Sequence, residues 1–305
     1  MHDHKIYQYI KILNLRGSIT STRGGKSHHF TDGEQKLGLR VHPRKSLGQH
    51  FLRDSIVVEN IIHAAELSPS DVIIEVGPGK GILTRGLAQQ HCRVIAVEVD
   101  SNLAILLRKA FIDYPDVSIV QADILQTDIA ALLSNICGTV LPYKMVANIP
   151  YYITSPILRY FLEGTVKPEL MVVMVQKEVG EAITAQPGQM SPLSVGIQYY
   201  GEPIIIGAVP AESFYPRPKV DSVILKIKPY PYPPVSVTDE EKFFHIVRAG
   251  FSAPRKQLRN SLAYGLHITP STAEALLEKA GISPRRRAET LSISEWHNIY
   301  TYTVT

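Results

Sequence analysis

The sequence predicts an α/β protein built on an open, mostly parallel sheet, with a small helical domain at its C-terminal end. Short apolar runs rich in Val and Ile alternate with helical patterns through the first two thirds of the chain. A glycine-rich turn follows an early run, and beyond a proline-rich stretch the pattern is helical. Apolar runs without alternation are typical of parallel strands that are covered on both faces.

The first predicted strand, residues 71–76, runs directly into a glycine-rich turn. Gly77, Gly79 and Gly81 permit positive φ and a close approach of a ligand, and a helix is expected from residue 82. The fingerprint G-x-G-x-x-G holds a pyrophosphate, but here the third glycine comes one residue early and Glu75 precedes the first. A carboxylate suits a ligand with a cationic amino-acid end instead, such as S-adenosylmethionine. Taken alone, the turn also fits an ordinary βα connection.

Two further predicted strands lead into acidic residues. Residues 93–98 end at Glu98, about 20 residues beyond the glycines, where an acid binds a ribose diol. Residues 118–121 lead to Asp123, which can accept a hydrogen bond from the amino group of a cofactor adenine. Either acid alone is better explained as a helix cap or a solvated charge. Their repetition at successive strand ends favours a site for S-adenosylmethionine.

The tetrapeptide Asn148-Ile149-Pro150-Tyr151 closes a fourth predicted strand, residues 145–147. The Asn148 side-chain oxygen and the Ile149 carbonyl can accept hydrogen bonds from an exocyclic amine. Pro150 fixes the turn, and Tyr151 can stack on the attached ring. This pattern predicts a pocket for an amino-bearing base such as adenine. For the tetrapeptide alone, a strand-ending turn with a surface tyrosine is the simpler interpretation.

In combination, these motifs resemble the rRNA adenine N6,N6-dimethyltransferase family (the KsgA/RsmA type), which is related to the macrolide-resistance rRNA methyltransferases. The likeness spans roughly residues 41–300, and its last segments resemble the dimethyladenosine branch more than the resistance branch. The matching segments are 44–52 (RKSLGQHFL), the glycine turn, Glu98, Asp123, 148–151 (NIPY), 214–222 (FYPRPKVDS), 250–260 (GFSAPRKQLRN) and the tail from Arg287 to Trp296.

The resemblance implies a class I, Rossmann-like methyltransferase that uses S-adenosylmethionine. Its expected substrate is 16S rRNA within a 30S subunit precursor, and its product is N6,N6-dimethyladenosine. His50 and Leu52 are expected to join the strand-end residues around the cofactor; His50 stands where many relatives carry Asn, and its imidazole can still donate to a carboxylate or ribose. Two alternatives stay open: a methyltransferase of the same fold on 23S rRNA or DNA, and a non-catalytic RNA-binding assembly factor.

The expected chemistry needs positioning more than a strong base. The N6 amine of adenine is a poor nucleophile, so the protein must hold it in line with the methyl group. Hydrogen bonds to Asn148 and Ile149 are expected to stabilise the charge that develops. Tyr151 and Phe214 are expected to clamp a base taken out of its stack, although Phe214 also fits a buried loop anchor.

The charge of the chain is distributed unevenly. Residues 1–40 hold seven Lys or Arg and three acids, a net charge of +4. Residues 242–287 hold nine Lys or Arg and two acids, a net charge of +7. Because the whole chain has a net charge of +4, the remaining residues carry −7. Clustered cations favour contacts with RNA phosphates, while a solvated helical face is the alternative. The predicted RNA-binding residues are Arg255, Lys256, Arg259, Arg285, Arg286 and Arg287.

Four segments are predicted along the chain: an extension (1–40), a catalytic domain (41–230), a proline-rich linker (231–239) and a helical RNA-binding domain (240–305). Within the catalytic domain we expect helices at 153–162 and 178–185, a strand at 170–175, and a closing antiparallel pair at 204–209 and 220–227. After the linker, Gly281 is expected to cap a helix over 273–280.

Residues 1–40 do not match the family pattern. They read either as a basic arm or targeting peptide, or as untranslated sequence before a true start near Leu39 or Val41; we favour the second interpretation or simple disorder. No apolar stretch reaches the roughly 18 residues needed to cross a bilayer. Two cysteines without partner spacing predict neither a metal site nor a disulfide framework. We therefore expect a soluble, cytoplasmic protein, and we expect it to be a monomer.

Overall fold

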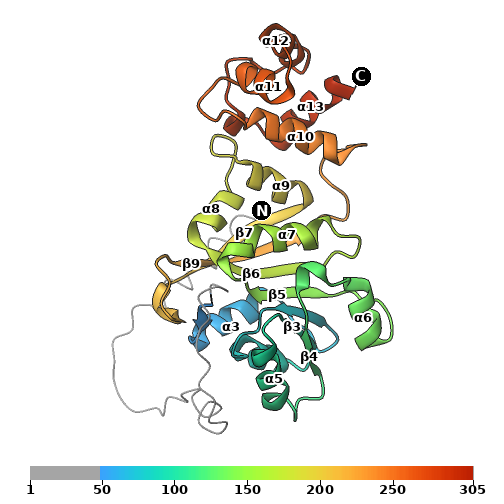
Figure 1. Cartoon of the computed structure of the whole chain (residues 1–305), viewed down its shortest axis with the longest axis vertical. Helices are drawn as coiled ribbons and strands as arrows, with labels where there is room; N and C mark the ends of the chain where they lie inside the picture. Colours follow the sequence, from blue (N-terminus) through green and yellow to red (C-terminus); the bar gives the residue numbers. More distant parts are fainter. Residues whose placement is uncertain (1–48, 305) are drawn as a thin grey trace, which may run out of the picture.

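The structure of the protein is a computed structural model that describes residues 49–304, so the predictions for residues 1–40 and the start of the 44–52 motif lie outside it. A seven-stranded sheet with helices on both faces forms the body, and the helices α10 to α13 stack on one end of it (Figure 1). This confirms the predicted α/β fold class with C-terminal helices.

The sheet has the order β4-β3-β2-β5-β6-β9-β7. The first five strands in this order are mutually parallel, and β9 runs antiparallel to both β6 and β7, which confirms the closing pair. The chain leaves β2 toward β3 and β4 and then crosses back to β5, so the direction of winding reverses between β2 and β5. The strands are β2 (Val72–Val76), β3 (Arg93–Glu98), β4 (Val117–Gln121), β5 (Lys144–Asn148), β6 (Leu170–Gln176), β7 (Gly201–Val209) and β9 (Ser222–Pro229).

The two faces of the sheet bury two different sets of helices. In β2, Val72 and Ile74 belong to one hydrophobic cluster, whereas Ile73 belongs to the other, as the period of a strand requires. The first cluster takes in α6, α7 and α9, and the second takes in α3 and α4. The helices of the body are α3 (Ser55–Ala64), α4 (Ile82–Ala88), α5 (Ser101–Ala110), α6 (Ile129–Cys137), α7 (Thr154–Glu163), α8 (Lys177–Ile183) and α9 (Pro192–Tyr200).

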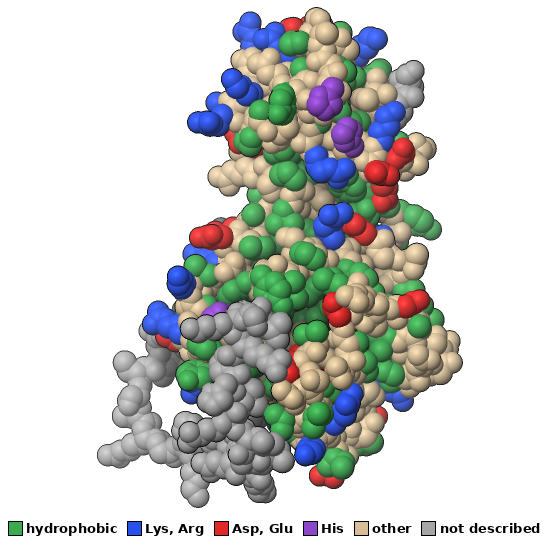
Figure 2. Space-filling model, viewed as in Figure 1, with side chains coloured by type: hydrophobic (Ala, Val, Ile, Leu, Met, Phe, Trp, Pro, Cys, Tyr) green, Lys and Arg blue, Asp and Glu red, His purple; other side chains and the backbone are tan. Residues whose placement is uncertain are grey.

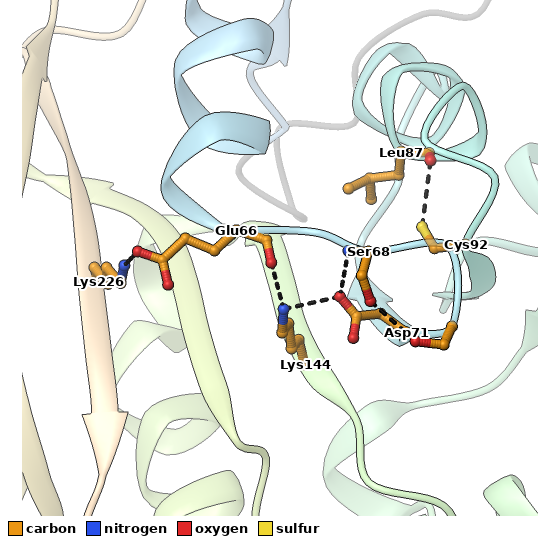
Figure 3. A network of polar contacts seen from close by, with 8 residues as sticks. Glu66, Ser68, Asp71, Leu87, Cys92, Lys144 and Lys226 are labelled. Atoms are coloured by element: carbon orange, nitrogen blue, oxygen red, sulfur yellow. Dashed lines mark hydrogen bonds and ion pairs between the residues drawn. The ribbon is translucent and has the colours of Figure 1, made fainter.

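A polar network fastens α3 to the sheet at the edge opposite the strand ends singled out above (Figure 3). Lys144 of β5 donates to the Glu66 carbonyl at 2.6 Å and to the Asp71 carboxylate at 2.8 Å. The Glu66 carboxylate in turn pairs with Lys226 of β9 at 2.7 Å. Glu66 lies just beyond α3, so this network ties the C-terminal end of that helix to β5 and β9.

The C-terminal helices pack around Trp296, which is fully buried. Gly250 allows this packing, since a Cβ there would lie 2.3 Å from the Trp296 ring. Gly281 lies two residues after Lys279, the last residue of α12, with φ +73, and the Ile282 N–H bonds the Leu277 carbonyl, which is the expected glycine cap. These helices are α10 (Glu240–Gly250), α11 (Leu258–Leu266), α12 (Pro270–Lys279) and α13 (Ile293–Val304).

The boundary between body and C-terminal helices is hydrophobic rather than open. Tyr199 of α9 contacts Phe243 of α10 at 5.2 Å between ring centroids, and one hydrophobic cluster includes both. The helix α9 has no counterpart among the predicted elements; Ser191 caps it and Pro192 opens it. None of the helices over residues 49–304 is long and apolar enough to cross a membrane.

A second, two-stranded sheet joins distant parts of the chain. β1 (Phe51–Leu52) pairs antiparallel with β8 (Phe214–Tyr215), with Phe51 opposite Tyr215 and Leu52 opposite Phe214. The pairing places the residues before β1 beside the loop after β8. It therefore joins the described end of the 44–52 motif to the start of the 214–222 motif.

Candidate functional site

A cavity opens at the carboxyl edge of the sheet, where the winding reverses between β2 and β5. Open α/β sheets bind ligands at this position. Its walls come from β1, the glycine turn and the ends of β3, β4 and β5. The predicted site residues that line it are His50, Leu52, Glu75, Gly77, Gly79, Glu98, Asp123, Asn148, Ile149, Pro150 and Tyr151.

The strand order explains why these residues meet. Asp123, Glu98, Glu75 and Asn148 belong to or follow β4, β3, β2 and β5, which are successive neighbours in the sheet. The structure therefore brings together the four strand ends that the sequence indicated. Of the predicted catalytic and cofactor-binding residues, Gly81 and Phe214 do not line the cavity.

The glycine turn uses left-handed backbone at all three glycines, with φ of +67, +57 and +79 at Gly77, Gly79 and Gly81. L-residues rarely adopt such angles. At Gly79 a Cβ would lie 3.1 Å from the Phe51 ring, so this glycine also keeps β1 close to the turn. Gly81 instead packs away from the cavity against Phe111, where a Cβ would lie at 2.8 Å. In the structure this glycine packs at the start of a helix, and it does not line the cavity where a cofactor contact was predicted.

Two carboxyl groups lie buried side by side behind the turn. Glu75 is 1% exposed, and its Oε2 has no hydrogen-bond partner in the described part of the chain. Burial, together with the charge of Glu98, raises the pKa of Glu75 to about 8. A cationic ligand group would supply the missing partner, so this buried oxygen fits the ammonium end of S-adenosylmethionine.

Glu98 has a second task besides lining the cavity. Its Oε2 accepts the Gly79 N–H at 3.3 Å and its Oε1 accepts the Asp100 N–H at 2.9 Å. Burial raises the pKa of the Glu98 carboxyl. The residue thus ties the glycine turn to the end of β3, and its remaining lone pairs are free for a ribose diol.

Asp123 combines the two interpretations that its sequence position allowed. Its Oδ1 accepts the Leu125 N–H at 3.0 Å, and its Oδ2 accepts from Gln126 at 3.2 Å, so the carboxylate caps a short helical turn. The residue also lines the cavity. Each carboxylate oxygen can accept a further hydrogen bond, so the cap does not prevent contact with an adenine amino group.

Asn148 and Tyr151 are each held by a hydrogen bond from a distant part of the chain. The Asn148 Nδ2 donates to the His50 carbonyl at 3.4 Å, which leaves Oδ1 as the acceptor turned to other partners. The Tyr151 hydroxyl bonds the Ser222 hydroxyl at 2.7 Å, and burial raises the Tyr151 pKa. Ser222, at the start of β9, had no role in the sequence prediction; only its place within the 214–222 motif marked it.

Phe214 differs from its predicted place above a base. It is 3% exposed and packs in the core cluster that contains Leu52 and Val209, which is the loop-anchor alternative. Strand alternation explains this, since Phe214 points inward and its neighbour Tyr215 points outward with 53% exposure. The Arg53 guanidinium lies 5.4 Å from the Tyr215 ring, and Tyr152 on the cavity wall is 57% exposed. Neither the exposed Tyr152 on the cavity wall nor the exposed Tyr215 of β8 had a predicted role.

The six predicted RNA-binding cations divide into two groups. Arg286 pairs with Glu295 and also donates to the Thr290 carbonyl at 2.6 Å, so its guanidinium is used within the fold. Arg259 pairs with Glu274 at 3.0 Å. For these two residues the structure favours a structural task over the predicted contact with phosphate, because the fold itself uses their charge. The exposed members are Arg255, Lys256, Arg285 and Arg287.

The exposed cations lie on two adjoining loops. The Leu258 N–H bonds the Arg286 carbonyl at 2.6 Å and the Arg259 N–H bonds the Pro284 carbonyl at 3.2 Å, which joins the loop before α11 to the loop before residue 288. We call Arg255, Lys256, Arg285 and Arg287 the basic cluster. Figure 2 shows Lys and Arg side chains spread over the helical end of the molecule.

Comparison with known proteins decides the family. A family model described as ribosomal RNA adenine dimethylase matches residues 41–304. The chain belongs to this family. Members of the family are S-adenosylmethionine-dependent methyltransferases, and the chain is an enzyme of this class.

The similar proteins agree with this assignment. The ribosomal RNA small subunit methyltransferase A of Dehalococcoides mccartyi is 48% identical over 263 residues, which cover 86% of this chain and 89% of the relative. The protein of the same name from Moorella thermoacetica is 44% identical over 263 residues, 84% of this chain and 91% of the relative.

Two solved structures share the fold. The 23S rRNA methyltransferase ErmE superposes with a TM-score of 0.65 at 28% identity, covering 84% of this chain and all of ErmE. A dimethyladenosine transferase from Plasmodium falciparum superposes with a TM-score of 0.68 at 24% identity, covering 82% of this chain and 96% of that protein. Both structures therefore share the overall fold of this chain.

Proposed function

We propose that the protein transfers methyl groups from S-adenosylmethionine to N6 of adenine in 16S rRNA of a 30S subunit precursor, giving N6,N6-dimethyladenosine. The observation that carries the proposal is the position of Asn148 to Tyr151 at the end of β5, in the cavity that also holds Glu75, Glu98 and Asp123. The 48% identity to a small subunit methyltransferase A, over 89% of its length, supports the choice of RNA.

The cavity fits the proposed cofactor in its backbone and its charge. The left-handed glycines of the turn leave the backbone open to close approach, and the unpartnered oxygen of Glu75 suits an ammonium group. Glu98 and Asp123 keep free lone pairs for a ribose diol and an adenine amine. When bound, S-adenosylmethionine supplies an electrophilic methyl group, so the chain itself need not provide a nucleophile.

The task left to the chain is to hold the target amine. Because Asn148 Nδ2 is engaged by His50, its Oδ1 is the group that accepts an N6–H, with the Ile149 carbonyl as second acceptor. Two such acceptors favour the positive charge that grows on N6 during transfer. Tyr151, fixed by Ser222, offers a ring face to the base; stacking of this kind contributes roughly 1–3 kcal/mol per base.

The basic cluster supplies a surface for the RNA backbone. Its four side chains are exposed, and one of them, Arg287, also lies 4.0 Å from the Glu289 carboxylate; Arg259 and Arg286 are only partly exposed and are paired more closely with carboxylates. Contacts of Lys and Arg with phosphates position a protein without reading sequence, and they make affinity depend on salt. The choice of the target adenine is therefore assigned to the cavity and its rim. We place the enzyme in the cytoplasm, where 30S precursors are assembled, and we expect it to act as a monomer.

The proposal is tested by methyl transfer from labelled S-adenosylmethionine to purified 30S subunits that lack dimethyladenosine, followed by nucleoside analysis. Parallel reactions contain 50S subunits and duplex DNA. We expect N6,N6-dimethyladenosine in the 30S reaction only. Label in 50S alone would move the chain to the 23S rRNA alternative, which its similarity to ErmE keeps in view. Cofactor binding without any transfer would favour a binding role.

A further inference from the structure

The residue His50 contacts three separate parts of the catalytic wall. Its backbone carbonyl accepts the Asn148 Nδ2–H at 3.4 Å. Its imidazole Nδ1–H donates to the Pro216 carbonyl, in the loop after β8, at 2.7 Å. Its ring stacks on Tyr151 with 5.8 Å between centroids and 25° between planes. His50 lines the cavity, but these three contacts run to the target side of it rather than to the glycine turn.

The partners of His50 are the groups whose relative positions must be kept for methyl transfer. Asn148 presents an acceptor, and Tyr151 presents a ring face. The β1–β8 pairing holds the backbone on either side, with Phe51 opposite Tyr215, so the imidazole closes the gap between two segments that are 166 residues apart. An amide that already donates to a fixed carbonyl cannot turn its nitrogen toward the target amine.

We propose that the His50 side chain is a positioning group for the target base. Its ring backs one face of Tyr151 and leaves the opposite face to the adenine. Its bond to Pro216 holds the backbone whose carbonyl orients Asn148. This rests on the proposed function, since it names the part that His50 plays in adenine methylation.

Two variants separate the contacts of the side chain. His50→Asn keeps an N–H donor close to the place of Nδ1 and removes the ring. His50→Phe keeps a ring for Tyr151 and removes the donor to Pro216. His50→Ala removes both, and the exposed His245 of α10, as His245→Ala, serves as the matched control.

The experiment measures kcat and KM for methyl transfer to the RNA that the wild type labels best, with the Kd of S-adenosylmethionine by calorimetry. We expect His50→Ala to lower kcat by roughly tenfold to a hundredfold, because small misplacement of reacting groups is costly. The kcat values of His50→Asn and His50→Phe should lie between those of His50→Ala and the wild type. The Kd of S-adenosylmethionine should change by less than about threefold in all three variants. His245→Ala should match wild type.

Two results would overturn the proposal. An unchanged kcat with a cofactor Kd weakened by more than tenfold would assign His50 to the cofactor. A faster His50→Ala enzyme would mean that the imidazole occupies the place of the base.

A double-mutant cycle on unfolding, with His50→Ala, Tyr151→Ala and the double variant, tests the contact without any substrate. We expect coupling equal to roughly a threefold or larger change in the unfolding equilibrium constant. No coupling would refute the contact. Failure of the wild type to label 30S would instead count against the proposed RNA, with the cycle still deciding on His50.

Discussion

At the scale of single residues, the buried carboxyl of Glu75 is the clearest case of a side chain that lowers the stability of the free protein where it can bind a ligand. A fully buried acid beside a second acid, Glu98, prefers its neutral form. The Oε2 atom of Glu75 has no hydrogen-bond partner in the described residues, so it can accept a hydrogen bond from a cationic ligand. Residues of this kind mark sites, since a merely structural position is better filled by an apolar side chain.

The raised pKa of Glu75 predicts how stability depends on pH. Its pKa is about 8 in the folded protein and 4.5 in an unconstrained chain, so its contribution is greatest below pH 4.5 and is lost as pH rises to 8. Glu75→Gln mimics the neutral acid and should lack this loss. Denaturant unfolding without cofactor should find the variant more stable than wild type by roughly 2–4 kcal/mol at pH 9. Parallel pH profiles for the two proteins would contradict this.

Ser222 holds the Tyr151 ring in place through a hydrogen bond between the two hydroxyl groups. Ser222→Ala removes the partner of the Tyr151 hydroxyl and should cost about 1 kcal/mol of stability. We also expect kcat to fall severalfold while the cofactor Kd stays unchanged, because the ring loses its anchor. Tyr151→Phe removes the same hydrogen bond and should behave alike in kinetic assays, and the double variant should be no worse than either. Additive losses would show that the bond does not link the two residues.

At the scale of elements, the glycine turn has two tasks that its spacing alone does not separate. Gly77 and Gly79 line the cavity, whereas Gly81 is the N-cap of α4 and packs against Phe111 and Leu107 of the α5 region. The early third glycine is explained by this helix contact.

Gly81→Ala tests the packing task against a matched control. Gly138 has nearly the same φ, +80 against +79, but has nothing within 4 Å of an added Cβ. Gly138→Ala should cost about 1–2 kcal/mol for left-handed backbone alone. Gly81→Ala should cost a further 1–3 kcal/mol or so for overpacking, as measured by urea unfolding. Equal losses for the two variants would exclude a packing role for Gly81.

Sequence patterns were sufficient to predict the long strands of the sheet but not the pairing of the two short strands. Apolar runs such as residues 170–175 located the parallel strands, because a buried strand must be apolar throughout. The pairing of β1 with β8 had no such signal, since two-residue strands carry no periodicity and lie far apart in the chain. Phe214 and Tyr215 are adjacent aromatics, and only the sheet reveals which one points inward. Sequence patterns therefore indicated the strand ends that line the cavity, whereas the exposed Tyr152 and Tyr215 carried no recognisable signal.

At the scale of the whole molecule, a catalytic edge and a basic helical end belong to one body. Hydrophobic packing of α9 against α10 joins them, so the helices that carry the basic cluster share a hydrophobic core with the body. Sequence alone indicated the excess of cations but not their tasks. Three successive arginines, Arg285 to Arg287, look equivalent until the pairing of Arg286 with Glu295 separates them.

The different tasks of these arginines predict different effects. Arg286→Ala should lower stability by about 1–2 kcal/mol, since it breaks a charged hydrogen-bond group, while the pair Lys256→Ala and Arg285→Ala should leave stability unchanged. The Lys256/Arg285 double variant should bind 30S subunits more weakly and reduce the slope of log K against log salt by about two. An unchanged slope would remove the basic cluster from the RNA contact.

The central claim, that Asn148 orients the target amine in a cavity that binds the cofactor independently, is tested most directly with Asn148→Ala. Methyl transfer to 30S subunits lacking dimethyladenosine and the Kd of S-adenosylmethionine are measured on the same preparation of variant and wild type. We predict a loss of transfer of at least roughly a hundredfold, as for removal of one preorganised hydrogen-bonding group, with a cofactor Kd within a few fold of wild type. Transfer at the wild-type rate would contradict the account.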